Sequence, residues 1–307
     1  MLLSFYTMLK VAWSENYVLP LPPHHRFPMS KYEVLPQQLL YEGTLTEANF
    51  FKPGCISEAE ICRTHASDYW SRLKGLQLTP REERRTGFPQ SPELVDREVT
   101  IMQGTVECVH FALQFGVAMN IAGGTHHAFT DRGEGFCLLN DIALAARHAL
   151  ENQLAQQVLV VDLDVHQGNG TAQIFQHDKR VFTFSMHGAN NYPLHKEISD
   201  LDIGLPDGVG DDFYLSTLDV NLNNLLERVQ PDLIFFQSGV DILSTDKLGK
   251  LAVTREGCKQ RDKLVLSAAK RNRIPLVASM GGGYSPDFRD IIEAHANTYR
   301  LAQELFF

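Results

Sequence analysis

The sequence lacks the cysteine patterns that build disulfide frameworks or thiolate zinc sites. Among its 307 residues there are five cysteines, an odd number, and no two of them have the CxxC spacing. They stand at positions 55, 62, 108, 137 and 258. Neither kind of site is therefore expected, and a reducing compartment is the simpler interpretation.

A membrane span and a secretion signal are missing as well. No run approaches the ~20 apolar residues that a transmembrane helix requires. The apolar start, MLLSFYTMLKVAW, has neither a basic region nor a small-residue cleavage site, so we interpret it as a first strand. We expect a soluble, cytoplasmic protein with no membrane partner.

Basic residues are scarce relative to acidic ones. The 28 Lys and Arg against 37 Asp and Glu give a formal net charge of −9. Binding to nucleic acid or to an anionic membrane surface depends on clustered Lys and Arg, so neither is expected as a partner. The acidic balance suits a positively charged small substrate better. The sequence leaves the oligomeric state open.

What the sequence does contain is a regular alternation of apolar runs and helical patterns. Strands are expected at 117–123, 158–164, 181–187, 233–239 and 275–281, and helices at 140–152, 212–229, 254–272 and 287–306. Strands that lack polar alternation and are separated by helices are typical of a parallel sheet covered on both faces. The sequence therefore predicts a single α/β domain over residues 1–307, with three α/β/α layers and a mostly parallel central sheet.

Two segments of the N-terminal third have the composition of loops. Residues 19–28, LPLPPHHRFP, are rich in proline, and residues 74–97 are charged and contain three prolines. Both are expected to be irregular. Ligands of open α/β sheets bind at the carboxyl ends of the strands, and the polar residues of this sequence gather at those ends. This agreement favours an enzyme.

The stretch VLVVDLDVHQGNG, residues 158–170, interrupts a buried strand with polar residues at alternate positions. Asp162, Asp164 and His166 would project from one side if the strand continued. A carboxylate and an imidazole together, as in Asp164 and His166, suit a divalent metal such as Zn²⁺. A strand end with exposed polar groups is the alternative interpretation.

A third metal ligand would come from the segment after strand 233–239. Asp241 follows that strand directly, and Asp246 is the competing candidate five residues later. An Asp₂His set leaves one coordination position open for water or substrate.

Tyr284 follows three glycines at the end of another strand. It is either a packed residue of a turn or, beside a metal, a hydroxyl that donates to a developing oxyanion.

Two adjacent histidines, His126 and His127, follow a Gly-Gly turn at the end of strand 117–123. One of them can remove a proton from water while the other stays charged, a division of roles that suits hydrolysis. Each needs a partner that sets its orientation, and Asp162 is a natural one. The second pair, His24-His25, lies in the proline-rich loop without a strand before it, so we interpret it as structural.

The motifs GGTHHAF, GEGFCLLND, VDLDVHQGNGT, SGVD and GGGY occur in an order that resembles the zinc-dependent histone deacetylase superfamily. The resemblance covers the chain from about residue 14 to the C-terminus. LPLPPHHRFPMSKYE and RRTGFPQSPELV look most like its class IV branch and bacterial relatives. It implies the arginase/deacetylase fold and metal-dependent hydrolysis of linear amides. The substrate would be an acyl-lysine protein, with acetyl or longer acyl groups, or a small acylated amine such as an acetylpolyamine.

The resemblance also implies a role for each motif residue. The ligands of one Zn²⁺ ion are matched by Asp164, His166 and Asp241. The tandem histidines are matched by His126 and His127, with His127 as the general acid/base. Tyr284 matches the oxyanion-stabilising tyrosine. The walls of an acyl-lysine tunnel are matched by Gly135, Phe136 and Tyr192. A structural monovalent-cation site, usually for K⁺, is matched by Asp162, Ser185 and Met186. Arg26 matches a residue of an inner cavity through which acetate leaves.

One position departs from the pattern of the superfamily. Most members have a second aspartate where this chain has Asn169, as the partner of the second histidine. A neutral partner stabilises an imidazolium less than a carboxylate does. We therefore predict a lower pKa for His127 than in relatives that have the aspartate. Asparagine is also what the class IV resemblance implies.

Two other functions stay open at this point. Arginase-type ureohydrolases share the fold but bind two manganese ions, and they need aspartates where this chain has Gly168 and Gly239. An acyl-lysine reader that has lost turnover is the second alternative. Its usual mark would be a missing tyrosine or histidine, whereas Tyr284, His126 and His127 are all present.

Overall fold

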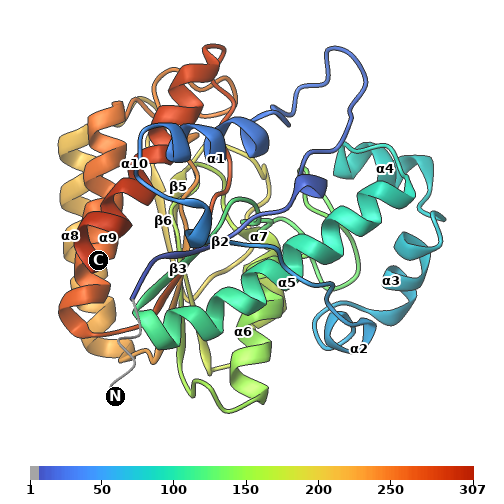
Figure 1. The fold of residues 1–307 in the computed structure, drawn as a ribbon, viewed down its shortest axis with the longest axis horizontal. Helices are drawn as coiled ribbons and strands as arrows, with labels where there is room; N and C mark the ends of the chain where they lie inside the picture. Colours follow the sequence, from blue (N-terminus) through green and yellow to red (C-terminus); the bar gives the residue numbers. More distant parts are fainter. Residues whose placement is uncertain (1–6) are drawn as a thin grey trace.

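The computed structural model describes residues 7–307, which build an eight-stranded sheet between two layers of helices (Figure 1). The strands are β1 (Lys10–Ala12), β2 (Phe50–Phe51), β3 (Val117–Asn120), β4 (Val158–Asp162), β5 (Val181–Gly188), β6 (Leu201–Leu205), β7 (Leu233–Gln237) and β8 (Leu276–Ser279). Their order in the sheet is β2-β1-β3-β8-β7-β4-β5-β6, and every neighbouring pair is parallel. The predicted α/β fold with a parallel central sheet is confirmed.

Helices cover both faces of this sheet. They are α1 (Lys31–Tyr41), α2 (Glu58–Ile61), α3 (Ser67–Lys74), α4 (Pro80–Thr86), α5 (Pro92–Phe115), α6 (Asp141–Glu151), α7 (Asn169–Phe175), α8 (Asp211–Val229), α9 (Arg255–Asn272) and α10 (Phe288–Phe306). Figure 1 shows α8, α9 and α10 on one side of the sheet and α5 and α6 on the other. All residues of β4 and β7 are buried, which explains their unbroken apolar runs. No helix within residues 7–307 is both long and apolar enough to cross a membrane.

Except for β5, the strands end earlier than the apolar runs that predicted them. β4 ends at Asp162 and β7 ends at Gln237. The polar residues that follow them therefore lie in loops at the carboxyl edge of the sheet, where alternation of side chains no longer applies. The first predicted strand contains β1, which begins at Lys10, while residues 1–6 lie outside the described part of the chain.

The prediction of a loop over residues 74–97 is wrong, because α4 and the start of α5 lie there. Thr79 and Glu82 form a capping box: the Thr79 hydroxyl accepts from the backbone N–H of Glu82, whose carboxylate accepts from the N–H of Thr79. Pro80 and Pro92 are the first helical residues of α4 and α5, where proline's missing N–H costs no hydrogen bond. Residues 19–28 are irregular, as predicted.

Candidate active site

The candidate residues follow four strands that are neighbours in the sheet. In the order β3-β8-β7-β4, these strands are followed by the histidine pair, the GGGY turn, the SGVD segment and the DVH segment. Because all four strands are parallel, their carboxyl ends meet at one edge. Residues more than 150 positions apart in the chain, such as His126 and Tyr284, therefore line the same cavity.

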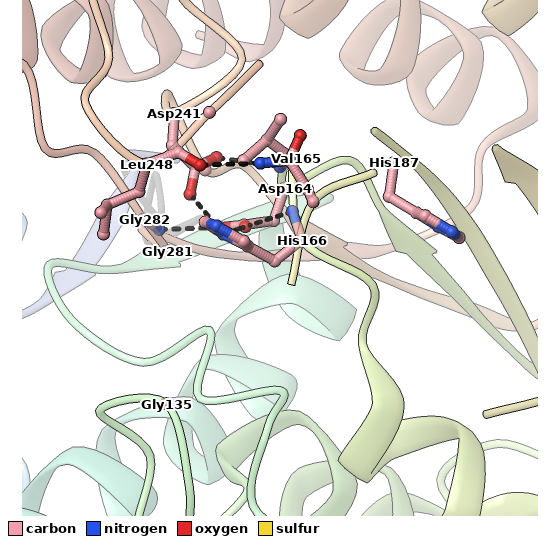
Figure 2. Close-up of polar contacts among 12 residues, drawn as sticks. Gly135, Asp164, Val165, His166, His187, Asp241, Leu248, Gly281 and Gly282 are labelled. Carbon is pink, nitrogen blue, oxygen red and sulfur yellow. Dashed lines mark hydrogen bonds and ion pairs between the residues drawn. The ribbon is translucent and has the colours of Figure 1, made fainter. Parts of the chain in front are cut away.

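Asp164, His166 and Asp241 form a buried cluster, and one ligand atom from each lies within 4.8 Å of the other two. Figure 2 shows the three side chains pointing toward one another. Backbone N–H groups orient the carboxylates: Val165 donates to Asp241 Oδ1 at 2.9 Å, and Gly282 donates to Asp164 Oδ2 at 3.0 Å. Asp241 Oδ2 is buried and lies 3.2 Å from Nδ1 of His166.

The buried negative charges of this cluster favour the binding of a cation. Burial and the adjacent Asp164 carboxylate raise the pKa of Asp241 to about 7. Although burial opposes its charge, the two carboxylates raise the pKa of His166 to about 10. Two buried carboxylates and one imidazole, gathered with little access to water, fit a divalent ion of the zinc type. Binding a metal would displace the proton from His166.

Asp246, the competing ligand candidate, has other partners. Its Oδ1 accepts from the backbone N–H groups of Leu248 and Gly249, at 2.8 and 3.0 Å. Its Oδ2 accepts from the N–H of Tyr284 at 2.6 Å. Asp246 therefore shapes the turn before Tyr284, and among residues 7–307 the metal-type cluster contains Asp241 instead.

The two adjacent histidines have different partners. Nδ1 of His126 lies 2.7 Å from Asp162 Oδ2, and Nδ1 of His127 lies 2.6 Å from Asn169 Oδ1. Although burial opposes its charge, the Asp162 carboxylate and the more distant Asp164 raise the pKa of His126 to about 9. Burial, together with the positive charge of His126, lowers the pKa of His127 well below its ordinary value. The pair thus supplies one charged and one neutral imidazole.

Glu134 sets the orientation of the Asn169 amide. Nδ2 of Asn169 donates to Glu134 Oε1 at 2.8 Å, so Oδ1 is the atom that faces His127. An amide oxygen only accepts, and His127 must therefore carry its proton on Nδ1 and leave Nε2 as the free base. Sequence reasoning missed Glu134, because its contact with Asn169 spans 35 positions.

Gly135, Phe136 and Tyr192 line a cavity of about 320 Å³ that also reaches His127 and Tyr284. The ring centroids of Phe136 and Tyr284 are 6.0 Å apart, and Tyr192 stands edge-on to His127 with centroids 4.9 Å apart. The structure thus brings together the residues expected for the tunnel.

The wall around Phe136 is bound to the end of α4. The N–H of Gly135 donates to the carbonyl of Arg85 at 3.0 Å, and the N–H of Phe136 donates to the carbonyl of Thr86 at 2.9 Å. Gly87 ends α4 with a left-handed φ of 80°, and a Cβ there would lie 2.8 Å from the Phe136 ring. Only glycine satisfies both conditions at this position.

The prediction for Arg26 is wrong. Arg26 is exposed and lines the cavity of about 320 Å³ described above, which we call the outer cavity. The guanidinium at the inner cavity belongs to Arg97 of α5, which is buried and donates to the carbonyl of Tyr17 at 2.8 Å and to Glu98 at 2.7 Å. Loop 19–28 turns the Arg26 side chain outward while its neighbour Phe27 packs inward.

The expected monovalent-cation residues lie on neighbouring strands. Asp162 and Ser185 are register partners across β4 and β5, and Met186 follows on β5. Asp162 Oδ1 accepts from the N–H of Asp164 at 3.2 Å, and Ser185 Oγ lies 2.9 Å from Nδ1 of His187. A K⁺ ion at this position stays a prediction.

Arg261 binds backbone carbonyls beside the segments that hold the candidate metal ligands. It was not identified from the sequence. It is fully buried on α9 and paired with Asp262 at 2.6 Å. Its Nη atoms donate to the carbonyls of Leu163 and Gly239, both at 3.0 Å. These carbonyls adjoin the loops that hold the candidate ligands. Nothing in the charged pattern of 254–272 distinguishes Arg261 from the exposed charges of the same helix.

Lys31 is a further buried cation that sequence reasoning missed, besides Arg97 and Arg261. Its side chain is fully buried, and Nζ donates to the carbonyl of Gly281 at 2.8 Å. Burial lowers its pKa to about 8. The contact ties the start of α1 to the GGGY turn, across 250 positions of sequence.

Comparison with known proteins agrees with this geometry. The profile described as "Histone deacetylase domain" matches residues 25–299. An uncharacterized protein of Picosynechococcus sp. is 44% identical over 296 residues, which are 96% of this chain and 99% of that protein. "Histone deacetylase 2" of Arabidopsis thaliana is 32% identical over 269 residues, covering 85% of this chain and 70% of the relative.

A solved structure has the same fold. The crystal structure of an HDAC homolog complexed with SAHA superposes with a TM-score of 0.83 at 22% identity, over 96% of this chain and 84% of the other. Fold and site together define a hydrolase that acts on amides and has the arginase/deacetylase architecture. The chain belongs to the histone deacetylase family. Its placement in the class IV branch stays a prediction.

Proposed function

We propose that this chain is a zinc-dependent deacylase that removes acetyl or longer acyl groups from lysine side chains. The observation that carries the proposal is the buried cluster of Asp164, His166 and Asp241 beside two histidines with different partners. The cluster adjoins a cavity lined by aromatic side chains, which suits the narrow, uncharged acyl-lysine group.

Asp164, His166 and Asp241 would hold the zinc ion. When bound, the ion supplies Lewis acidity toward the acyl carbonyl and lowers the pKa of water toward ~7. The protein supplies the proton transfers. His127, neutral and with Nε2 free, takes the proton of the attacking water and returns it to the leaving amine. His126 stays charged through its contact with Asp162.

Tyr284 completes the constellation. Its ring lies at the same cavity as His127, and its backbone is fixed by the hydrogen bond to Asp246. Burial raises the pKa of its phenol well above the ordinary value, so the hydroxyl keeps its proton near neutral pH. A protonated phenol donates a hydrogen bond to the oxygen that becomes negative as water attacks the amide.

The arginase-type alternative is not favoured by the space around the site. A Cβ at Gly168 would clash with Oδ2 of Asp162, and a Cβ at Gly239 would clash with Oδ2 of Asp164. Aspartates at these positions, which a two-manganese site requires, do not fit beside the carboxylates already there. The reader alternative lacks support as well, because His127 and Tyr284 both border the cavity.

The proposal is tested by metal analysis and by a kinetic panel of lysine peptides acylated from acetyl to myristoyl, with acetylspermidine as the small-amine substrate. We expect one zinc per chain and hydrolysis of acyl-lysine. Tyr284→Phe should lower kcat by about 10²–10³-fold, because one oxyanion donor is lost, and should retain the zinc. Two manganese ions per chain would instead support the arginase-type site. Binding of acyl-lysine without hydrolysis by the zinc-loaded protein would support a reader.

Asn169→Asp is expected to move the acidic limb of the kcat/KM profile to higher pH, by about one unit or more. The neutral form of His127 is the active base. A carboxylate beside its Nδ1 favours the protonated form, so the pKa rises and the base is lost at a higher pH than in the wild type. The measurement is kcat/KM against pH with the zinc-loaded variants.

Glu134 provides the control for this substitution. In Asn169→Asp alone, the new carboxylate would face that of Glu134, which in the wild type accepts a hydrogen bond from the Asn169 amide. The double variant Asn169→Asp/Glu134→Gln exchanges amide and carboxylate, keeping the net charge and a donor between the two positions. It should show the same upward shift with better stability. An acidic limb unchanged in both variants would contradict the role of His127.

A further inference from the structure

The mouth of the outer cavity has a charge opposite to that of the whole chain. Of the twelve residues that line this cavity, three are arginines and none is Asp or Glu. The arginines are Arg26, Arg84 and Arg85, which we call the basic rim. All three are exposed, and they surround the opening of a protein whose formal net charge is −9.

The basic rim is built into the wall of the tunnel. Arg84 and Arg85 are in the last turn of α4, whose end is held by the hydrogen bonds from Gly135 and Phe136 described above. The capping box at the other end fixes the start of the same helix. The backbone that carries these two guanidinium groups is therefore placed by the tunnel itself, and a substrate that enters the tunnel must pass them.

Two of the three charges are not neutralised by the protein. Arg26 and Arg84 form no ion pair and no side-chain hydrogen bond with any residue of 7–307, whereas Arg85 lies 3.8 Å from a Glu134 carboxylate oxygen. Glu134 is already engaged by Asn169. A concave site lined by charges of one sign concentrates the field at its opening. Charges elsewhere on the surface contribute little there, because salt screens them beyond about 10 Å at 0.1 M.

We propose that the basic rim selects acyl-lysine peptides with an acidic residue next to the acyl-lysine and rejects acylated polyamines. The inference rests on the proposed deacylase function and names its substrate class. The acyl-lysine side chain is uncharged, so the residues beside it decide the electrostatics at the mouth. A flanking carboxylate can accept hydrogen bonds from the guanidinium forks of Arg26 or Arg84. A polyamine carries ammonium groups, and no carboxylate lines the cavity to receive them.

The basic rim favours a substrate of the opposite charge to the one that the composition favours. The acidic balance of the whole sequence suits a cationic substrate, but that balance is distributed over the entire surface. The three arginines come from two segments, residue 26 in the loop 19–28 and residues 84–85 in α4, which the fold brings to one opening. A substrate group at the mouth is therefore affected by the positive charge of these arginines more than by the net negative charge of the chain.

The first measurement compares three acetyl-lysine peptides of equal length whose flanking residues are Asp, Asn or Lys, together with acetylspermidine, using the zinc-loaded full chain. We expect kcat/KM for the Asp peptide to exceed that for the Lys peptide by about tenfold at about 0.1 M salt, where more distant charges are screened and each exposed charge pair contributes modestly. The ratio should fall toward one at about 1 M salt, where screening acts within ~3 Å. Acetylspermidine should be hydrolysed more slowly than the Asp peptide.

The second measurement uses matched variants. Arg26→Gln/Arg84→Gln should reduce the ratio of kcat/KM between the Asp and Lys peptides to about two or less, because the two unpaired positive charges at the mouth are removed. Arg81→Gln is the control: Arg81 is exposed on the same helix but does not line the cavity, so the ratio should stay that of the wild type. Circular dichroism and zinc content verify that each variant is folded.

The outcomes separate the inference from the function on which it rests. A wild-type ratio near or below one, an unchanged ratio in the double variant, or acetylspermidine hydrolysis as fast as that of the Asp peptide would overturn the role of the basic rim. Failure to hydrolyse even the Asn peptide would overturn the deacylase function instead. In that case the dissociation constants of the same labelled peptides, measured by fluorescence anisotropy, still test the charge preference of the mouth.

Discussion

Asp241→Asn is expected to abolish zinc binding and to lower kcat/KM by roughly 10³-fold or more, on the order of the several kcal/mol that a metal Lewis acid contributes. The substitution is nearly isosteric. Asn keeps the Oδ1 acceptor that receives the N–H of Val165 at 2.9 Å, and it replaces only Oδ2, the buried oxygen that lies 3.2 Å from Nδ1 of His166. Zinc content by atomic spectrometry and kcat/KM on an acetyl-lysine peptide are the measurements.

Asp246→Asn is the matched control, because Asp246 is the neighbouring carboxylate of the same loop. Its oxygens are engaged by backbone N–H groups, so we expect this variant to keep about one zinc per chain. It should still lose some activity, because the N–H of Tyr284 would lose its carboxylate acceptor. Zinc retained by Asp241→Asn and lost by Asp246→Asn would make Asp246 the third ligand.

The second large effect is expected for His127→Ala, which should lower kcat/KM by roughly 10²–10⁴-fold with zinc retained. The loss follows from the removal of the Nε2 base, which the hydrogen bond to Asn169 leaves unprotonated. The acidic limb of the pH profile should disappear with it. His24→Ala, in the exposed proline-rich loop, is the control and should change kcat/KM little.

A small loss in His127→Ala would locate the base elsewhere. His126 is the nearest candidate, since the two rings have centroids 4.1 Å apart. Its contact with Asp162 raises its pKa to about 9, which makes it a poor base at neutral pH. A fall of less than about tenfold, with the acidic limb still present, would therefore contradict the assignment of the two histidines.

The sequence was sufficient for the six inner strands of the sheet and for the residues at its carboxyl edge, but it did not predict the two edge strands, β2 and β6. Both depend on local patterns: apolar runs mark the buried strands, and the residues that follow a parallel strand must lie at one edge. The different roles expected for Asp162 and Asp164 have a physical reason in the structure, because β4 ends at Asp162 and the chain then turns. One residue contacts His126 and the other the candidate metal ligands.

The features that sequence reasoning missed depend on contacts between distant segments. Arg261 reaches a carbonyl 98 positions away, and Glu134 reaches Asn169 across 35. Composition misled at α4 and α5, where prolines begin helices and do not mark a loop. Arg26 was assigned to the inner cavity by resemblance alone, and the direction of one side chain in an irregular loop has no signal in the sequence.

In the proposed deacylase, Gly87 links the shape of the tunnel wall to the position of two of the charges at its mouth. Its left-handed backbone seats the end of α4 directly against the Phe136 ring, so the helix that carries Arg84 and Arg85 is held by the same residues that form the tunnel wall. A side-chain change that widened the tunnel for a bulkier acyl group would also move the charges at its entrance. We therefore expect substitutions that reshape the tunnel wall to change both proposed selectivities, whereas substitutions of the exposed rim arginines change only the second.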